Sequence, residues 1–146
     1  MIEISQAKPN HIEAVKVFYG KCGYGGGPIS EEDLIFIAHL DNKIIGAVRL
    51  CPNIDFFVLR GMQVLAPFQR QGIGTQLLQI CTKQLVNRVC YCIPWQHLRS
   101  FYQQVKFQEV SPVEVPFLLR ERFDNYISRE MNVILMRRLP ILSEIL

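Results

Sequence analysis

The sequence predicts a mixed α+β fold in which a mostly antiparallel central sheet is flanked by helices. Three strand-like segments joined by short turns occupy residues 35–64, which indicates an antiparallel meander. A helical period follows and leads to another strand, and such a crossover adds a parallel neighbour to the sheet. The length of 146 residues and the apolar fraction of 49% are sufficient for one core, so we expect a single domain over residues 1–146.

The N-terminal segment predicts a strand, a helix and a loop. Isoleucines alternate with a polar residue over residues 2–4, as in a strand with one buried face. Asn10 is a suitable N-cap for an amphipathic helix that ends at Gly20 or Gly23. Three consecutive glycines within residues 24–28 predict a loop.

The next segment predicts a short second helix and then the meander. Ser30–Asp33 has the spacing of a capping box, with Asp33 in the acidic position. Strands are expected at residues 35–40, 43–51 and 56–64, and Asp-Asn at 41–42 is suited to a two-residue hairpin turn. Short connections of this kind make neighbouring strands antiparallel.

The C-terminal half alternates between helix and strand. Apolar residues at 75–85 follow a helical period after Pro67. The remaining expectations are a strand at 88–93, a short helix at 97–105 and strands at 109–115 and 132–136. The predicted order is β-α-α-β-β-β-α-β-α-β-β, with the basic segment between the last two strands unassigned.

Charge is unevenly distributed along the chain. The net charge is +3, but residues 49–106 hold seven basic residues and one acidic residue. A basic middle third fits an anionic ligand. The sequence has no Lys/Arg run with interleaved aromatics, which a nucleic-acid-binding surface would show. No apolar run reaches the roughly 20 residues of a membrane span, and the N-terminus does not resemble a signal peptide. We therefore expect a cytoplasmic protein that binds neither nucleic acid nor membranes.

The five cysteines are scattered among apolar residues, which predicts reduced core thiols. Cys90 and Cys92 would share one strand face, and His97 lies nearby in the sequence. No further Cys or His pair follows at ligand spacing, so we expect no metal site.

The segment Gln69-Arg70-Gln71-Gly72-Ile73-Gly74-Thr75 is the sharpest local signal. It connects a predicted strand, Met62-Gln63-Val64, to a predicted helix. Glycines at a helix start leave successive N–H groups free to face one anion, and Arg70 can add a positive charge. A dinucleotide fingerprint would need a third glycine where Leu77 stands, and no Gly-Lys-Ser/Thr of a P-loop occurs.

The spacing Gln69-x-x-Gly72-x-Gly74 resembles the Q/R-x-x-G-x-G/A motif of the GNAT N-acetyltransferase superfamily, and the element order is similar to that of the family. Residues 101–107, Phe-Tyr-Gln-Gln-Val-Lys-Phe, resemble the family's F-Y-x-x-x-G-F segment, with Lys106 in place of Gly. The resemblance implies acetyl-CoA as cosubstrate and coenzyme A as product, bound where two parallel strands part. By position, the resemblance assigns coenzyme binding to Met62, Gln63, Val64, Gln69, Arg70, Gln71, Gly72, Ile73, Gly74 and Thr75.

The implied reaction is direct attack of a neutral amine on the thioester in a ternary complex. A phenol can protonate the departing thiolate, and Tyr102 is the expected acid. No base is evident. Glu31, Glu32 and Asp33 belong either to a solvated helix start or to an acceptor lid, where they would favour a cationic amine, and a water relay is a further alternative.

Three function hypotheses stay open in the sequence. The preferred one is an N-acetyltransferase for a small-molecule or peptide amine. The others are a catalytically silent acyl-CoA sensor and, on the basic middle third alone, a nucleic-acid-associated protein. The apolar residues at 141–146 would pack either on the core or on a second subunit, which would be a homodimer.

Overall fold

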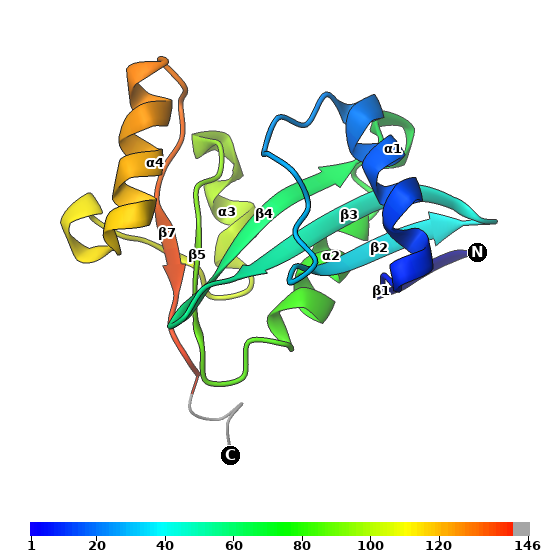
Figure 1. Cartoon of the computed structure of the whole chain (residues 1–146), viewed down its shortest axis with the longest axis horizontal. Coiled ribbons are helices and arrows are strands. Elements are labelled where there is room, and N and C mark those ends of the chain that lie inside the picture. Colours follow the sequence, from blue (N-terminus) through cyan, green and yellow to red (C-terminus); the bar gives the residue numbers. More distant parts are fainter. Residues whose placement is uncertain (142–146) are drawn as a thin grey trace.

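The computed structural model describes residues 1–141 and contains one seven-stranded sheet with helices on both faces (Figure 1). The strands are β1 (Ile2–Gln6), β2 (Leu34–Leu40), β3 (Lys43–Pro52), β4 (Phe56–Val64), β5 (Val89–Cys92), β6 (Gln108–Glu109) and β7 (Met136–Arg138). The helices are α1 (Ile12–Cys22), α2 (Ile73–Thr82), α3 (Arg99–Gln103) and α4 (Phe117–Ser128).

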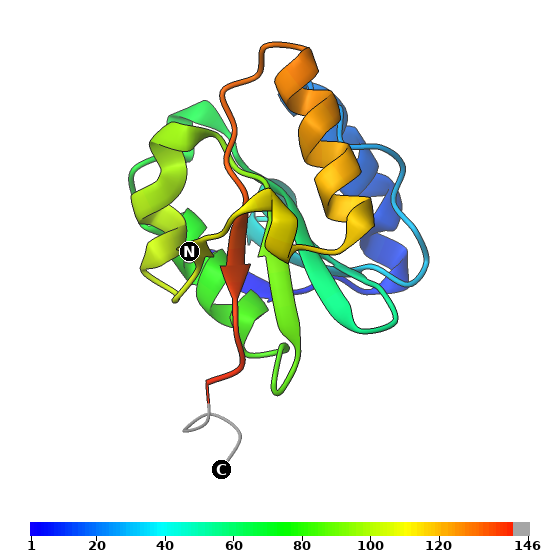
Figure 2. The same ribbon diagram turned by 90° about the vertical axis from the view of Figure 1, so that its left-hand side faces the viewer.

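The strand order is β1-β2-β3-β4-β5-β7-β6, and β4–β5 is the parallel pair while the others are antiparallel. Helices α1 and α4 cover one face and α2 and α3 cover the other (Figure 2). The crossover from β4 through α2 to β5 therefore creates the parallel pair, as the change in period predicts. The predicted mixed fold class is confirmed.

The core is divided between the two faces of the sheet. On the α2 face, Phe36, Leu77 and Phe107 belong to the largest cluster of buried side chains. On the other face, one cluster packs under α1 and another under α4 around Leu119. Successive residues of β4 alternate between these clusters, so Leu59 faces α2 whereas Val58 faces α4.

The predicted meander is confirmed nearly to the residue. Asp41 and Asn42 both have positive φ, 52° and 73°, as a two-residue hairpin turn requires. Helix α1 ends at Cys22 with Gly23 in the left-handed conformation, which agrees with the predicted glycine stop. It begins later than predicted, because Pro9–His11 forms a 3-10 turn.

The predicted helix at residues 30–33 is wrong. One of the two capping-box contacts is present, since the Ser30 N–H donates to Asp33 Oδ2, but Ser30 Oγ accepts from the Glu32 N–H instead of the Asp33 N–H. These hydrogen bonds close only a turn, because the chain enters β2 at Leu34 and the Asp33 carboxylate also accepts hydrogen bonds from buried Arg49. The tertiary ion pair overrides the local helix signal.

The C-terminal part departs further from the prediction. The expected strand at 109–115 is reduced to β6, because Pro112 begins a 3-10 turn. The unassigned segment contains α4, and the last strand, expected at 132–136, is β7 at Met136–Arg138. The observed order is thus β-α-β-β-β-α-β-α-β-α-β. The predicted packing of the C-terminal run falls on residues 142–146, outside the described residues.

No helix within residues 1–141 has both the length and the apolar character needed to cross a bilayer.

Candidate active site

The central feature is the place where β4 and β5 part. They pair from Phe56–Val89 to Val58–Tyr91, and β4 then continues to Val64 without a strand on that side. Gly61 forms a bulge with φ +67°, and its carbonyl accepts a hydrogen bond from the Tyr19 hydroxyl at 2.8 Å. A cavity of about 420 Å³ opens at this divergence.

The predicted phosphate-binding turn leads directly from the end of β4 into α2. Arg70 and Gly72 have positive φ, 64° and 83°, so the backbone curves before the helix begins at Ile73. The first helical bond runs from the Gln76 N–H to the Gly72 carbonyl. The N–H groups of residues 72–75 donate no hydrogen bond to any residue within 1–141. Such a row of free donors at a helix N-terminus is an anion-binding arrangement.

Side chains around this turn leave its donors uncovered. Gln69 Nε2 donates to the Val64 carbonyl and Gln71 Nε2 donates to the Pro67 carbonyl, so both side-chain amides stabilise the turn through backbone carbonyls that precede it. A Cβ at Gly72 would meet open space, whereas a Cβ at Gly74 would lie 3.0 Å from the Phe101 ring. Gly74 thus allows α2 to pack closely on α3, and Gly72 keeps the approach to the N–H groups clear.

The predicted strand residues lie at the cavity, apart from Val64. Met62 and Gln63 line it, and the Val64 carbonyl is engaged by Gln69. Because β4 has no partner beyond Val58 on the β5 side, alternate backbone groups of this stretch face the gap. They form an exposed edge to which an extended chain can add.

Tyr102, the predicted acid, also lines the cavity. It lies on α3, is 5% exposed, and contacts the rings of Phe101 and Phe107 edge-on. Burial, with smaller contributions from the Cys92 and Cys81 thiols, raises its pKa well above the ordinary tyrosine value. The phenol therefore stays protonated across the physiological range. The structure brings Tyr102, Met62 and Gln63 to one cavity, while residues 69–75 lie beyond its lining.

The loop after α1 forms one wall of the cavity. Gly23, Tyr24, Gly25 and Gly26 line it, and Gly26 packs against the Tyr24 ring so closely that a Cβ would overlap it. Arg49 holds this loop: its guanidinium donates to the Tyr24 hydroxyl, to the Gly27 and Pro28 carbonyls, and to Asp33. Neither Glu31, Glu32 nor Asp33 lines the cavity.

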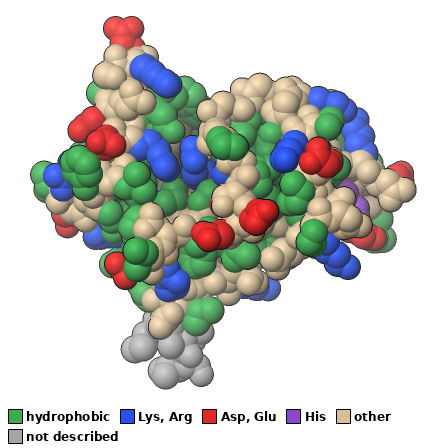
Figure 3. All heavy atoms as spheres, viewed as in Figure 1, with side chains coloured by type: hydrophobic (Ala, Val, Ile, Leu, Met, Phe, Trp, Pro, Cys, Tyr) green, Lys and Arg blue, Asp and Glu red, His purple; other side chains and the backbone are tan. Residues whose placement is uncertain are grey.

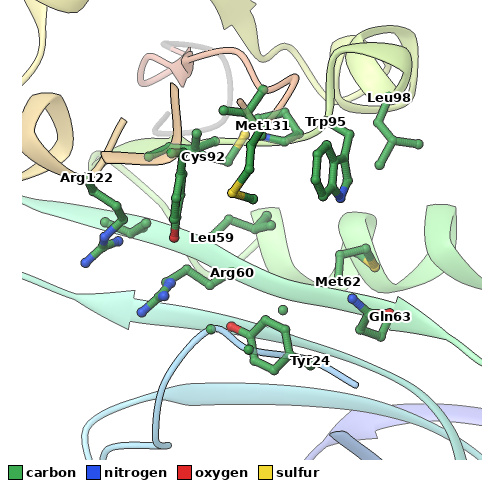
Figure 4. A pocket seen from close by; sticks show the side chains of 18 of the residues that line it. Tyr24, Leu59, Arg60, Met62, Gln63, Cys92, Trp95, Leu98, Arg122 and Met131 are labelled. Carbon is green, nitrogen blue, oxygen red and sulfur yellow. The ribbon is translucent and has the colours of Figure 1, made fainter. Parts of the chain in front are cut away.

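Three arginines missed by the sequence prediction line the cavity: Arg60, Arg122 and Arg129. In Figure 3, basic side chains occupy the hollow between α4 and the segment before β2. Figure 4 shows the guanidinium groups of Arg60 and Arg122 at one end of the cavity and Trp95, Leu98 and Met62 at the other. Arg122 and Arg129 are seven residues apart, which would have indicated one helical face had α4 been predicted.

Within residues 1–141, no group of three His, Cys, Asp or Glu side chains is placed to hold a metal ion. All five cysteines are free thiols. Burial raises the pKa of Cys81, Cys90 and Cys92, so these thiols stay neutral.

Solved structures that are similar to this chain share its fold. N-acetylglutamate synthase from Neisseria gonorrhoeae, solved with coenzyme A and N-acetyl-glutamate, has a TM-score of 0.69 and 19% identity, covering 97% of this chain and 35% of that one. The chain thus spans about a third of the synthase. Ribosomal-protein-S18-alanine N-acetyltransferase from Escherichia coli has a TM-score of 0.68 and 17% identity, covering 100% and 99%. An acyl-CoA N-acyltransferase from Pseudomonas aeruginosa has a TM-score of 0.68 and 17% identity, and the match covers 94% of this chain and 99% of that one.

Sequence comparison with curated proteins gives no significant match. A family profile, however, matches residues 31–109, from the turn before β2 to β6. This profile describes the acetyltransferase (GNAT) domain and includes the glycine turn, the parting strands and Tyr102. The match extends over more than half of the sequence, and the chain therefore belongs to the GNAT acetyltransferase family.

Proposed function

We propose that this chain binds acetyl-CoA and transfers its acetyl group to an amine in a ternary complex. The observation that carries the proposal is the row of free N–H groups at residues 72–75, next to the divergence of β4 and β5. Peptide donors and a helix N-terminus together favour a diphosphate. The unpaired edge at residues 59–64 suits the pantetheine arm, whose amides can pair as an added strand would.

The residues present fit this cosubstrate along its length. The turn of Gln69–Thr75, with Arg70 exposed beside it, would hold the diphosphate, and Met62–Val64 would hold the arm. The bound coenzyme supplies an acetyl thioester, which is the activated acyl group. The apolar residues Met62, Trp95 and Leu98 would line the part of the cavity beside the arm.

In the transfer, the N–C bond forms, the C–S bond breaks, the amine loses a proton and the thiolate gains one. Tyr102 is the proposed donor to the thiolate, because its raised pKa keeps the phenol protonated. A thiolate with a pKa near 8.5 can accept this proton when the hydroxyl lies within hydrogen-bond reach. An N–H on the β4 edge is the proposed donor to the developing oxyanion.

No Asp, Glu or His from the described residues lines the cavity, so the proposed acceptor of the amine proton is water. The same observation favours a second candidate function, a silent acyl-CoA sensor. Titration calorimetry with coenzyme A tests the binding site, and release of coenzyme A thiol with a panel of amines tests turnover. Binding with turnover supports the enzyme, whereas binding without turnover on any amine supports the sensor.

We also propose a cytoplasmic protein without nucleic-acid or membrane partners. Among the basic residues of the middle segment, Arg70 is then the one assigned to the coenzyme site, and a homodimer stays a prediction. Gel filtration tests the dimer. Loss of any nucleic-acid binding on adding coenzyme A would assign the positive charge to this site.

A further inference from the structure

The cavity beside β4 has a charge pattern that a simple amine site does not need. Its cationic residues are Arg60 from β4, Arg122 from α4, and Arg129, which directly follows α4. No Asp or Glu within residues 1–141 lines it. A positive amine brought into such surroundings would be repelled, so the pocket is made for a group of opposite charge.

Arg49 is a buried arginine with a counter-ion from the protein and serves as a comparison for Arg122. Its buried guanidinium is paired with Asp33 at 2.8 Å, and both side chains are 3% exposed. Arg122 is different, because its Nη1 atom is buried and makes no hydrogen bond to the described residues. A buried guanidinium nitrogen without an acceptor is costly, and a ligand oxygen would remove that cost.

Arg60 and Arg122 also lie close enough to affect each other. Burial, and next the charge of Arg60, lowers the pKa of Arg122. In Figure 4 both guanidinium groups lie at the same end of the cavity. Two like charges held together without a protein anion are stabilised when an anion binds between them, and guanidinium forks match a carboxylate in two-point hydrogen bonding.

We propose that Arg60 and Arg122 bind the carboxylate of the acceptor, which is a small amino acid. This inference rests on the proposed acetyl transfer and specifies its acceptor class. A carboxylate at the arginine end directs the amino acid's amine toward the divergence of β4 and β5. The cavity of about 420 Å³ has room for a molecule of this size next to the thioester.

Turnover of matched acceptors tests the carboxylate. L-leucine and L-leucinamide have the same side chain, but the amide lacks the α-carboxylate. L-glutamate and its α-amide differ in the same way. The amide has the less basic amine and therefore more of the reactive form, so a preference for the acid does not arise from amine pKa. We expect kcat/KM to be about tenfold or more higher for the acids. Equal rates would overturn the inference.

Four single substitutions on the wild-type chain assign the effect to residues. Arg122→Gln or Arg60→Gln should abolish the preference for the acids while changing coenzyme A affinity less than twofold. Arg122→Lys should restore part of it, because charge returns without the fork. Glu121→Gln, one position away on the outer side of α4, should change neither quantity. An undiminished preference in both arginine variants would contradict the assignment.

Trp95 provides a readout that does not depend on turnover, since it lines the cavity and is the single tryptophan. N-acetyl-L-leucine should change its fluorescence at concentrations at least tenfold lower than N-acetyl-L-leucinamide. Failure of coenzyme A to bind would defeat the proposed function, whereas this carboxylate preference would persist and still support the anion site. Preference for 3-aminopropylphosphonate over 4-aminobutyrate, or turnover of peptides alone, would overturn the amino-acid assignment.

Discussion

Asp33 Oδ2 lies 2.8 Å from Arg49 Nη2, in an ion pair that is buried between the turn before β2 and the middle of β3. Through the same guanidinium, this pair fixes the Tyr24 hydroxyl and the carbonyls of Gly27 and Pro28. The wall of the cavity thus depends on a contact remote from the proposed chemistry. Asp33 acts neither as a solvated helix cap nor as an acceptor ligand.

Asp33→Asn should lower the free energy of unfolding by about 3 kcal/mol, because it leaves the buried Arg49 charge without its counter-ion. Urea unfolding followed by circular dichroism measures this loss. Glu32→Gln, on an exposed neighbour, should stay within about 0.5 kcal/mol of the wild type. Equal stability of the Asp33 and Glu32 variants would show that the pair contributes nothing.

Gly72→Glu should reduce coenzyme A affinity by at least about a hundredfold, because its carboxylate would enter the space before the free N–H groups and repel a diphosphate. Titration calorimetry measures the affinity. Gly27→Glu is the matched control, since Gly27 has a similar φ of +86° and also faces open space. Both variants carry the same backbone strain and charge, so wild-type affinity in Gly72→Glu would refute the site.

Tyr102→Phe should lower kcat by about a hundredfold while leaving coenzyme A affinity unchanged. Because burial raises the pKa of Tyr102, the wild-type rate should rise with pH as the acceptor amine loses its proton, without a fall at pH 9 to 10. Stopped-flow assays of thiol release across pH 6–10 provide the test. Identical profiles for the two proteins would remove Tyr102 from the acid role.

Stability should decline as the pH rises above about 9. The pKa values of Cys81, Cys90, Cys92, Tyr19 and Tyr102 are raised in the folded state, chiefly by burial. In the unfolded chain these pKa values return to about 8.5 for thiols and about 10 for phenols. Above these pH values the unfolded state binds fewer protons than the folded state, so a rise in pH favours unfolding. Their contribution is complete below those values and is lost above them. A urea midpoint that is constant from pH 7 to 10.5 would contradict this.

The local part of the fold could be predicted from the sequence. The Asp41-Asn42 turn and the glycine stop at Gly23 depend on backbone conformations that only a few residues adopt readily, so residue type identified them. The segment 56–64 was predicted with both ends correct. The predicted helix at Ser30 is wrong because the decisive partner of Asp33 is Arg49, which lies 16 residues after Asp33 in the chain.

Tertiary contacts account for the rest. Helix α4 has a weak apolar face, and Leu119 is its buried residue, so packing under β4 and β5 rather than periodicity defines it. The cationic end of the cavity joins Arg60 to Arg122 across 62 positions, and no local pattern predicts that meeting. The glycine turn could be predicted from the sequence because its residues are contiguous.

The central claim is that the backbone N–H groups at the start of α2 bind the coenzyme's diphosphate. Backbone amide NMR shifts test this directly when coenzyme A and pantetheine, which lacks the diphosphate, are titrated separately. Coenzyme A should shift the amides of residues 72–75 and of 59–64, whereas pantetheine should shift those of 59–64 alone. Amides at 72–75 that do not respond to saturating coenzyme A would contradict the account.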